Sequence, residues 1–156
     1  MQRGQTLAYL AGLLDGDGYF KVTRAYRTPG TVHPYYATIV GVAQLWPSEA
    51  VGTFASTIEG AVMKPQKTSA GRLMARCEVQ GSKAESAARR LLPFLLVKRD
   101  QALLLLEIAR TRPHERGRAR RERAVDDEME SLRQALSSLH SGSWRSGKPL
   151  PVSPWL

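Results

Sequence analysis

The sequence has little cysteine, little histidine and no long apolar run. Cys77 is the only cysteine among 156 residues, so the chain can form neither an internal disulfide nor a cysteine-rich zinc site. We interpret Cys77 as a small core residue and expect an intracellular, reducing compartment such as the cytoplasm, an organelle or a phage-infected host cell. No second histidine lies at metal-ligand spacing from His114, which we therefore interpret as a loop residue.

No stretch of the sequence is apolar for long enough to cross a bilayer, and residues 1–5 lack the apolar core of a signal sequence. We therefore expect no membrane partner. A chain of 156 residues can bury a substantial core, and 42% of its residues are hydrophobic. We predict a single domain over residues 1–142 and a C-terminal tail, rich in Ser, Gly and Pro, over residues 143–156.

Acidic residues are also few relative to basic ones. The chain has 23 Lys and Arg against 14 Asp and Glu, a formal net charge of +9, so a polyanion is the natural partner. The most basic run spans residues 112–123. It predicts either a solvated loop and helix start or sequence-independent contact with phosphates.

The most informative stretch of the sequence is a predicted junction between a helix and a strand. Apolar residues at helical spacing form one stripe: Leu7, Leu10, Ala11 and Leu14. Ala8 and Gly12 lie one helical turn apart on another face, where another backbone can approach closely. From Tyr19 to Arg24 the pattern changes to strand alternation.

Two carboxylates, Asp15 and Asp17, lie where this helix ends and its dipole is already negative. One interpretation is that the neighbouring glycines cap the helix while Asp15 bonds nearby amides and Asp17 is solvated. The other is that Asp17 awaits a cation. A calcium loop of the EF-hand type is excluded, because that loop needs Gly in place of Phe20 and Glu in place of Tyr26.

The remaining patterns and turn residues predict alternating pairs of strands and helices. After the first helix, the expected elements are strands over 19–26 and 35–43, a helix over 46–59, strands over 61–67 and 72–80, and helices over 82–92, around 103–108 and over 125–140. A capping box of Ser82 and Glu85 is expected to open the third helix. The order predicts an α+β fold in which helices cover one face of a four-stranded sheet built from two hairpins and leave the other face free.

Alternation along the strands predicts a polar, basic set of side chains on the free face, which in a chain of this charge favours DNA binding. Arg and Gln can read purine edges and Lys can hold phosphates. Tyr35, Ala37 and Ile39 on the second strand are less polar, which indicates either apolar contact with thymine methyl groups or a strand poorly suited to DNA. The candidate DNA-binding residues are Lys21, Thr23, Arg27, Lys64, Gln66, Arg72 and Arg76.

The run Leu-Ala-Gly-Leu-Leu-Asp-Gly-Asp-Gly at residues 10–18 resembles the signature of the LAGLIDADG homing endonucleases, with seven of nine letters unchanged. Two shorter runs resemble later parts of the same family, Val-Ala-Gln at 42–44 and Leu-Pro-Phe-Leu-Leu-Val-Lys at 92–98. The resemblance is to single-motif members and implies an αββαββα fold whose antiparallel four-stranded sheet forms a DNA-binding saddle.

By this resemblance Asp17 is a metal-ligand acid, with the Gly16 carbonyl adding to the site. Gln44 is expected to orient water, and Lys98 to supply positive charge or to polarise the attacking water. Alternatively, Gln44 only caps a helix and Lys98 only begins one. The sequence departs from the family at Ser48, where a basic residue is common.

One motif per chain implies a homodimer, in which Ala8 and Gly12 pack against their symmetry mates and two copies of Asp17 meet. The resemblance therefore predicts an endonuclease that makes staggered cuts in double-stranded DNA at a long pseudo-palindromic site, with Mg²⁺ as cofactor and Mn²⁺ as a substitute. An alternative is a non-cleaving protein of the same fold, either a DNA-binding regulator or an intron RNA splicing factor. A third hypothesis is a basic structural protein whose motif is coincidental.

Overall fold

The computed structural model of the chain describes residues 3–26, 34–111 and 123–140. Several sequence-based predictions concern residues outside these ranges. They are the DNA contact of Arg27, the loop assignment of His114, most of the basic run 112–123 and the tail 143–156.

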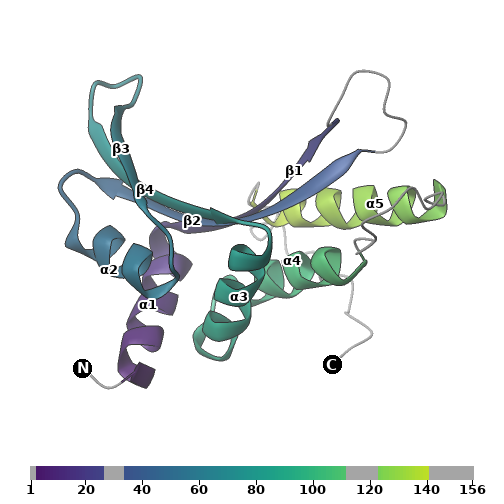
Figure 1. Cartoon of the computed structure of the whole chain (residues 1–156), viewed down its shortest axis with the longest axis horizontal. Helices are drawn as coiled ribbons and strands as arrows, with labels where there is room; N and C mark the ends of the chain where they lie inside the picture. The colour runs from purple at the N-terminus through teal and green to yellow at the C-terminus, as the bar shows by residue number, and fades with distance from the viewer. Residues whose placement is uncertain (1–2, 27–33, 112–122, 141–156) are drawn as a thin grey trace.

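The described chain contains five α-helices, a short 3-10 helix and four strands (Figure 1). In chain order they are α1 (Arg3–Asp17), β1 (Gly18–Ala25), β2 (Tyr35–Leu45), α2 (Glu49–Thr57), β3 (Val62–Lys67), β4 (Leu73–Gln80), α3 (Ser82–Leu91), η1 (Leu92–Phe94), α4 (Arg99–Thr111) and α5 (Arg123–His140). The α+β fold predicted from the sequence is confirmed.

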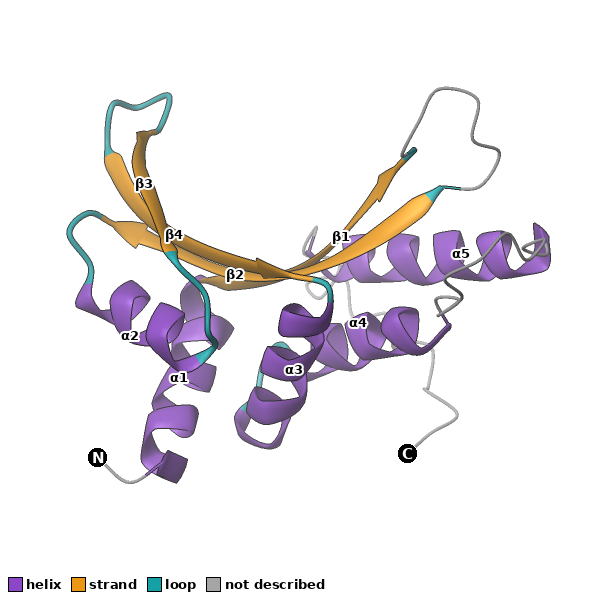
Figure 2. Cartoon of the chain, in the orientation of Figure 1, coloured by secondary structure: helices purple, strands orange, loops and turns teal. Residues whose placement is uncertain are grey.

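The four strands form one antiparallel sheet in the order β1-β2-β4-β3, so the two hairpins meet through β2 and β4. The sheet is strongly bent, and the helices lie on its convex side (Figure 2). None of the described helices lies on its concave side. No helix in the part of the chain that the structure describes is both long and apolar enough to cross a membrane.

The core fills the space between the convex face of the sheet and the helices. Phe20 and Val22 of β1 and Val40 of β2 point into it, as strand alternation predicts, and meet Leu10 and Leu14 of α1. Cys77 on β4 is fully buried and free, so it is the small core residue expected from the sequence, and burial raises the pKa of its thiol.

A set of polar contacts attaches α5 to the sheet. The Glu130 carboxylate accepts hydrogen bonds from Arg133 Nη2 at 2.7 Å, Gln134 Nε2 at 3.1 Å and Tyr36 Oη at 3.3 Å. Arg24 of β1 lies 3.9 Å from the same carboxylate. The hydrogen bond from Arg133 is the main cause that lowers the pKa of Glu130 to about 2.

The start of α3 differs from the prediction. Its N-cap is Gly81, with a φ of 60°, and not Ser82, so the expected capping box that begins at Ser82 is wrong. The chain turns from β4 into α3 through a left-handed backbone conformation that favours glycine. The Gly81 carbonyl itself accepts the hydrogen bond from Glu85 N at 3.0 Å.

Candidate active site and nucleic-acid interface

Helix α1 runs into β1 without a loop, because the helix ends at Asp17 and the strand begins at Gly18. A side chain at Gly18 has no room, since an added Cβ would lie 2.7 Å from Leu14 Cα and 2.8 Å from Leu14 O. Both obstacles are backbone atoms, which cannot rotate away. This close packing explains why glycine directly follows Asp17.

Lys98 occupies the negative end of α1. Its ammonium donates to the carbonyls of Leu14 at 2.8 Å, Gly18 at 2.8 Å and Gly16 at 3.4 Å. Burial lowers the pKa of Lys98, and the nearby carboxylates of Asp15 and Asp17 oppose that shift. The ammonium therefore compensates both the helix dipole and the carboxylates that the sequence left unexplained.

Asp15, at the end of α1, in turn caps the start of α4. Its Oδ2 accepts from Leu96 N and its Oδ1 from Lys98 N, both at 2.8 Å. The Lys98 carbonyl in turn accepts the first helical hydrogen bond, from Ala102 N at 3.1 Å. The end of α1 and the start of α4 thus cap each other, so Asp15 bonds amides that are distant in the sequence rather than nearby ones.

Asp17 is exposed but is not merely solvated. Gln44 Nε2, near the end of β2, donates to Asp17 Oδ2 at 2.7 Å, and Ser48 Oγ donates to Gln44 Oε1 at 2.6 Å. Ser48 is also the N-cap of α2, because its Oγ accepts from Val51 N at 3.2 Å. Since an ionised carboxylate only accepts, the amide must face Asp17 with its nitrogen, and this fixes the direction of the whole chain of bonds.

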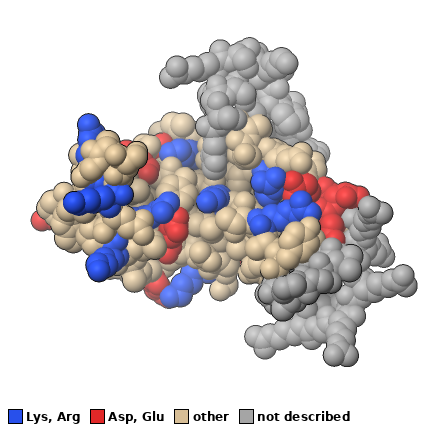
Figure 3. Space-filling view, turned by 90° about the horizontal axis from the view of Figure 1, so that it is seen from above, with Lys and Arg blue, Asp and Glu red and all other residues tan. Residues whose placement is uncertain are grey.

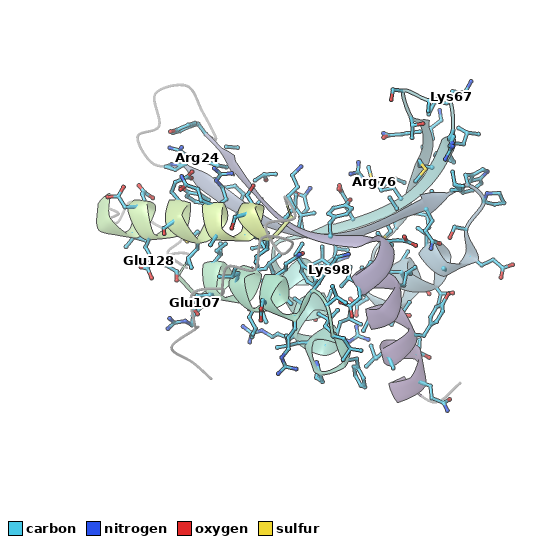
Figure 4. All side chains as sticks on the ribbon, turned by 180° about the vertical axis from the view of Figure 1, so that it is seen from behind. Arg24, Lys67, Arg76, Lys98, Glu107 and Glu128 are labelled. Carbon is cyan, nitrogen blue, oxygen red and sulfur yellow. The ribbon has the colours of Figure 1, made fainter. Side chains whose placement is uncertain are left out.

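The structure thus brings together the four predicted site residues Gly16, Asp17, Gln44 and Lys98, from α1, β2 and the start of α4. Figure 4 shows Lys98 among the helices below the sheet and Arg76 on its concave side. Ala8 and Gly12 are exposed on α1, and an added Cβ at Gly12 would meet nothing within 4 Å. That face of α1 is therefore open in the single chain.

The candidate DNA-binding residues are distributed unevenly over the concave face. Lys21 and Thr23 lie on it from β1, and Arg76 lies on it from β4. Gln66 shares this face through its pairing with Met74, while Lys64 lies within an irregular part of the β3–β4 register. Arg72 is exposed just before β4. Seen from above in Figure 3, Lys and Arg are scattered along the molecule with some Asp and Glu among them.

The apolar middle strand β2 is largely covered on this face. Ile39 lies in register with Lys21 on one side and Gln80 on the other, and only 5% of it is exposed. Gly41 is also buried, beneath the ring of Tyr19. Longer side chains of β1 and β4 therefore form most of the concave surface, and Ile39 offers little area to a thymine methyl group.

Sequence reasoning missed a contact across the middle of the concave face. Tyr19 of β1 donates a hydrogen bond to Glu78 of β4, and Arg76 Nε donates to Tyr19 Oη at 2.9 Å. Burial, followed by the bond to Glu78, raises the pKa of Tyr19. The alternation of residues places all three on one face, but only the strand register could have predicted that they meet.

Sequence reasoning also missed an exposed apolar segment beside the site. Leu96 is 88% exposed and Val97 is 61% exposed, although both directly precede the half-buried Lys98. The bonds from Asp15 hold this segment against the end of α1. Two adjacent apolar side chains are thus exposed on a segment that is fixed beside the candidate site.

Neither a protein-family model nor a curated protein sequence matches the chain. Solved structures do match it. The homing endonuclease I-CvuI in complex with its target has a TM-score of 0.72 and 24% identity, over 88% of this chain and 83% of that one. The archaeal intron-encoded homing endonuclease I-Vdi141I, complexed with DNA, has a TM-score of 0.57 and 13% identity, over 90% and 100% of the two chains.

A third similar structure is the LAGLIDADG homing endonuclease I-GzeII with its DNA target, at a TM-score of 0.60 and 14% identity. The match covers 81% of this chain and 43% of I-GzeII. In this chain the run at residues 10–18 forms the end of α1 and its passage into β1. The resemblance stated from the sequence is confirmed at the level of the fold: the chain has the architecture of the LAGLIDADG homing endonucleases.

Proposed function

We propose that the protein is a homodimeric, Mg²⁺-dependent endonuclease that makes staggered cuts at a specific site in double-stranded DNA. The observation that carries the proposal is the convergence of an exposed carboxylate, an amide and an ammonium where α1 meets β1, at the sheet whose concave face is open. Similar structures support it, since I-CvuI, I-Vdi141I and I-GzeII were each solved with DNA.

The donor atoms at this junction suit Mg²⁺, which is usually held by one or two carboxylates together with waters and phosphates. Asp17 and the Gly16 carbonyl provide oxygen donors at an exposed helix end, and Asp17 Oδ1 accepts no hydrogen bond from the described residues. No group of three or more His, Cys, Asp or Glu side chains among those residues could hold a metal ion alone. In the proposal, DNA phosphates and a second copy of Asp17 complete the site.

When bound, Mg²⁺ would supply charge screening for the phosphate and a more acidic water. Gln44, held at both ends of its amide by Asp17 and Ser48, keeps the carboxylate oriented and can position a water molecule. Lys98 adds positive charge next to Asp17 while its ammonium stays bonded to the carbonyls of Leu14 and Gly18. Ser48 replaces a cation with a hydroxyl that orients Gln44, so the phosphate must be stabilised by other groups.

Dimerisation follows from the need to cut two strands with one acidic site per chain. The exposed small residues Ala8 and Gly12 allow two copies of α1 to pack closely. Further apolar area is exposed by Tyr9 on the same helix, at 48%, and by Leu96 and Val97 beside the end of α1. A two-fold dimer would bring both Asp17 residues together and double the DNA sequence that the sheets contact.

A second function is favoured by Ser48. Without a basic residue at this position, the protein could bind a nucleic acid without cutting it, as a DNA-binding regulator or an intron RNA splicing factor. A structure of I-CvuI with the I-CreI target in the presence of Mg also holds uncleaved DNA, so binding without cleavage is seen with this fold. Cleavage by the wild-type protein would exclude this alternative.

The test is a cleavage selection on a randomised DNA library with Mg²⁺, with Mn²⁺ and with Ca²⁺. We expect defined staggered cuts with Mg²⁺ that Asp17→Asn abolishes while binding persists. Glu49→Gln removes the same charge from an exposed position nearby and serves as the matched control. An enriched site that is bound but never cut would support the second function, and no enrichment would refute both.

A further inference from the structure

The contact across the concave face rests on one row of the sheet. Tyr19 of β1 pairs with Gly41 of β2, and Gly41 pairs with Glu78 of β4. Because Gly41 has no side chain, the Tyr19 ring can lie across β2 and reach β4. A Cβ at Gly41 would lie 2.6 Å from Tyr19 Oη and 2.9 Å from Glu78 Cγ, so any other residue would displace this contact.

The chemistry of the three side chains fixes the direction of their hydrogen bonds. Arginine has no acceptor, so Arg76 Nε donates to Tyr19 Oη at 2.9 Å, and the Tyr19 hydroxyl must then donate to Glu78. Arg76 Nη2 lies 3.2 Å from Glu78 Oε1 and closes a triangle. The guanidinium carbon also lies 5.5 Å from the centre of the Tyr19 ring.

A purely stabilising role does not explain this triangle well. The Arg76 side chain is 40% exposed, and ion pairs with that degree of exposure contribute little to stability. The triangle also lies on the open face of the sheet rather than among the helices. What it does achieve is to hold a long, otherwise mobile side chain in one orientation.

The held orientation leaves a specific edge of the guanidinium for a ligand. Tyr19 occupies Nε, and the Nη1 group has no partner among the described residues. One N–H of Nη1 and the second N–H of Nη2 form a pair of parallel donors. This pair matches the O6 and N7 acceptors that guanine presents in the major groove. Because the side chain is ordered before DNA arrives, binding would lose less conformational entropy.

We propose that Arg76 reads a guanine in each half of the DNA site, with Tyr19 and Glu78 as the positioning residues that aim it. The inference rests on the proposed function, because it needs DNA on the concave face. Tyr19 is two residues from Asp17, so this guanine lies closer to the cleaved bonds than bases contacted through Thr23. Glu78 also disfavours the binding of a DNA phosphate to Arg76, because its carboxylate repels phosphates.

The experiment is a binding selection on a library with randomised half-sites, in Ca²⁺, for wild type and four variants. Wild type should select guanine at one symmetric pair of positions. Arg76→Ala should lose that preference alone, by roughly 5- to 150-fold. Tyr19→Phe and Gly41→Ala should weaken the same preference partially, because they release Arg76 without removing it. Arg72→Ala, an exposed arginine outside the triangle, should lower affinity for all sequences alike.

A second measurement uses a modified base. Replacing the selected guanine with 7-deazaguanine removes the N7 acceptor, which should lower the affinity of wild type and leave that of Arg76→Ala unchanged. Thermal melting of each variant checks that the fold is retained. If a site is enriched but Arg76→Ala keeps every base preference, or weakens all positions equally, the inference is wrong while the proposed function stands. If wild type enriches no site, both are wrong.

Discussion

Gly12 offers the sharpest test of how two copies of the chain would assemble. It lies within α1 with open space around the position of a Cβ. In a monomer, Gly12→Ala should therefore be stabilising, because alanine favours the helix by about 1 kcal/mol over glycine. For a chain of 156 residues this corresponds to a rise of ~2–4 °C in melting temperature.

In a dimer that packs α1 against α1, the same methyl group has the opposite effect. Overpacking a close contact costs roughly 1–3 kcal/mol, and a two-fold interface contains the substitution twice. The loss of at least about 2 kcal/mol per dimer should raise the dissociation constant on the order of 30-fold. Gly12→Ala should thus separate the stability of the folded chain from the stability of its assembly.

Sedimentation equilibrium over a range of concentrations, together with thermal melting at a concentration where the chain is monomeric, measures both quantities. Gly52→Ala is the matched control, because Gly52 lies within α2 and also has open space around its Cβ position. It should raise the melting temperature and leave the dissociation constant unchanged. If Gly12→Ala dimerises as tightly as wild type, the small-residue face of α1 is not the interface.

Two further predictions concern Ser48 and Glu130. Ser48→Ala removes the side chain that caps α2 and should cost about 1 kcal/mol of stability. Ser48→Asp can cap the helix again and should restore the melting temperature. It should not restore cleavage, because an ionised carboxylate cannot donate a hydrogen bond to Gln44 Oε1. Ser48→Thr keeps the hydroxyl and should retain both, and full cleavage by Ser48→Asp would contradict the role of this bond. Because the pKa of Glu130 falls from 4.5 to about 2 on folding, its contribution to stability is present above pH ~5 and is lost as the pH falls toward 2. Glu130→Gln should therefore be less stable than wild type at pH 7. Urea unfolding at a series of pH values should show that the difference in unfolding free energy between the two proteins decreases as the pH falls. A difference that does not change with pH would argue against the ion pairs with Arg133 and Arg24.

The sequence predicted those features that depend on neighbours along the chain. The change from helical spacing to strand alternation around Asp17 located the α1–β1 junction, and the turn residues 68–71 located the hairpin of β3 and β4. The contact of Gln44 with Asp17 was not derivable from periodicity, because it depends on how far β2 extends beside α1. β2 in fact continues to Leu45, beyond the end expected at residue 43.

Contacts between distant elements were the ones that sequence reasoning could not supply. The charges of Asp15 and Asp17 were unexplained at a helix end because their compensating ammonium, Lys98, is more than eighty residues away. Tyr19 and Glu78 meet only because two strand registers align them over Gly41. The wrong cap at Ser82 has a local cause, since the tight turn at Gly81 uses a backbone carbonyl where a side chain was expected.

The mutual capping of α1 and α4 has a mechanical consequence. The segment from Leu96 to Lys98 carries the exposed apolar pair at one end and the ammonium that holds the α1 carbonyls at the other. The Asp15 carboxylate accepts hydrogen bonds from the backbone at both of those ends, from Leu96 N and from Lys98 N, so the segment is fixed to the end of α1. In the proposed dimer, a contact of the partner subunit with Leu96 or Val97 would act through these hydrogen bonds on the helix end that carries Asp17, and would couple assembly to the alignment of the proposed site.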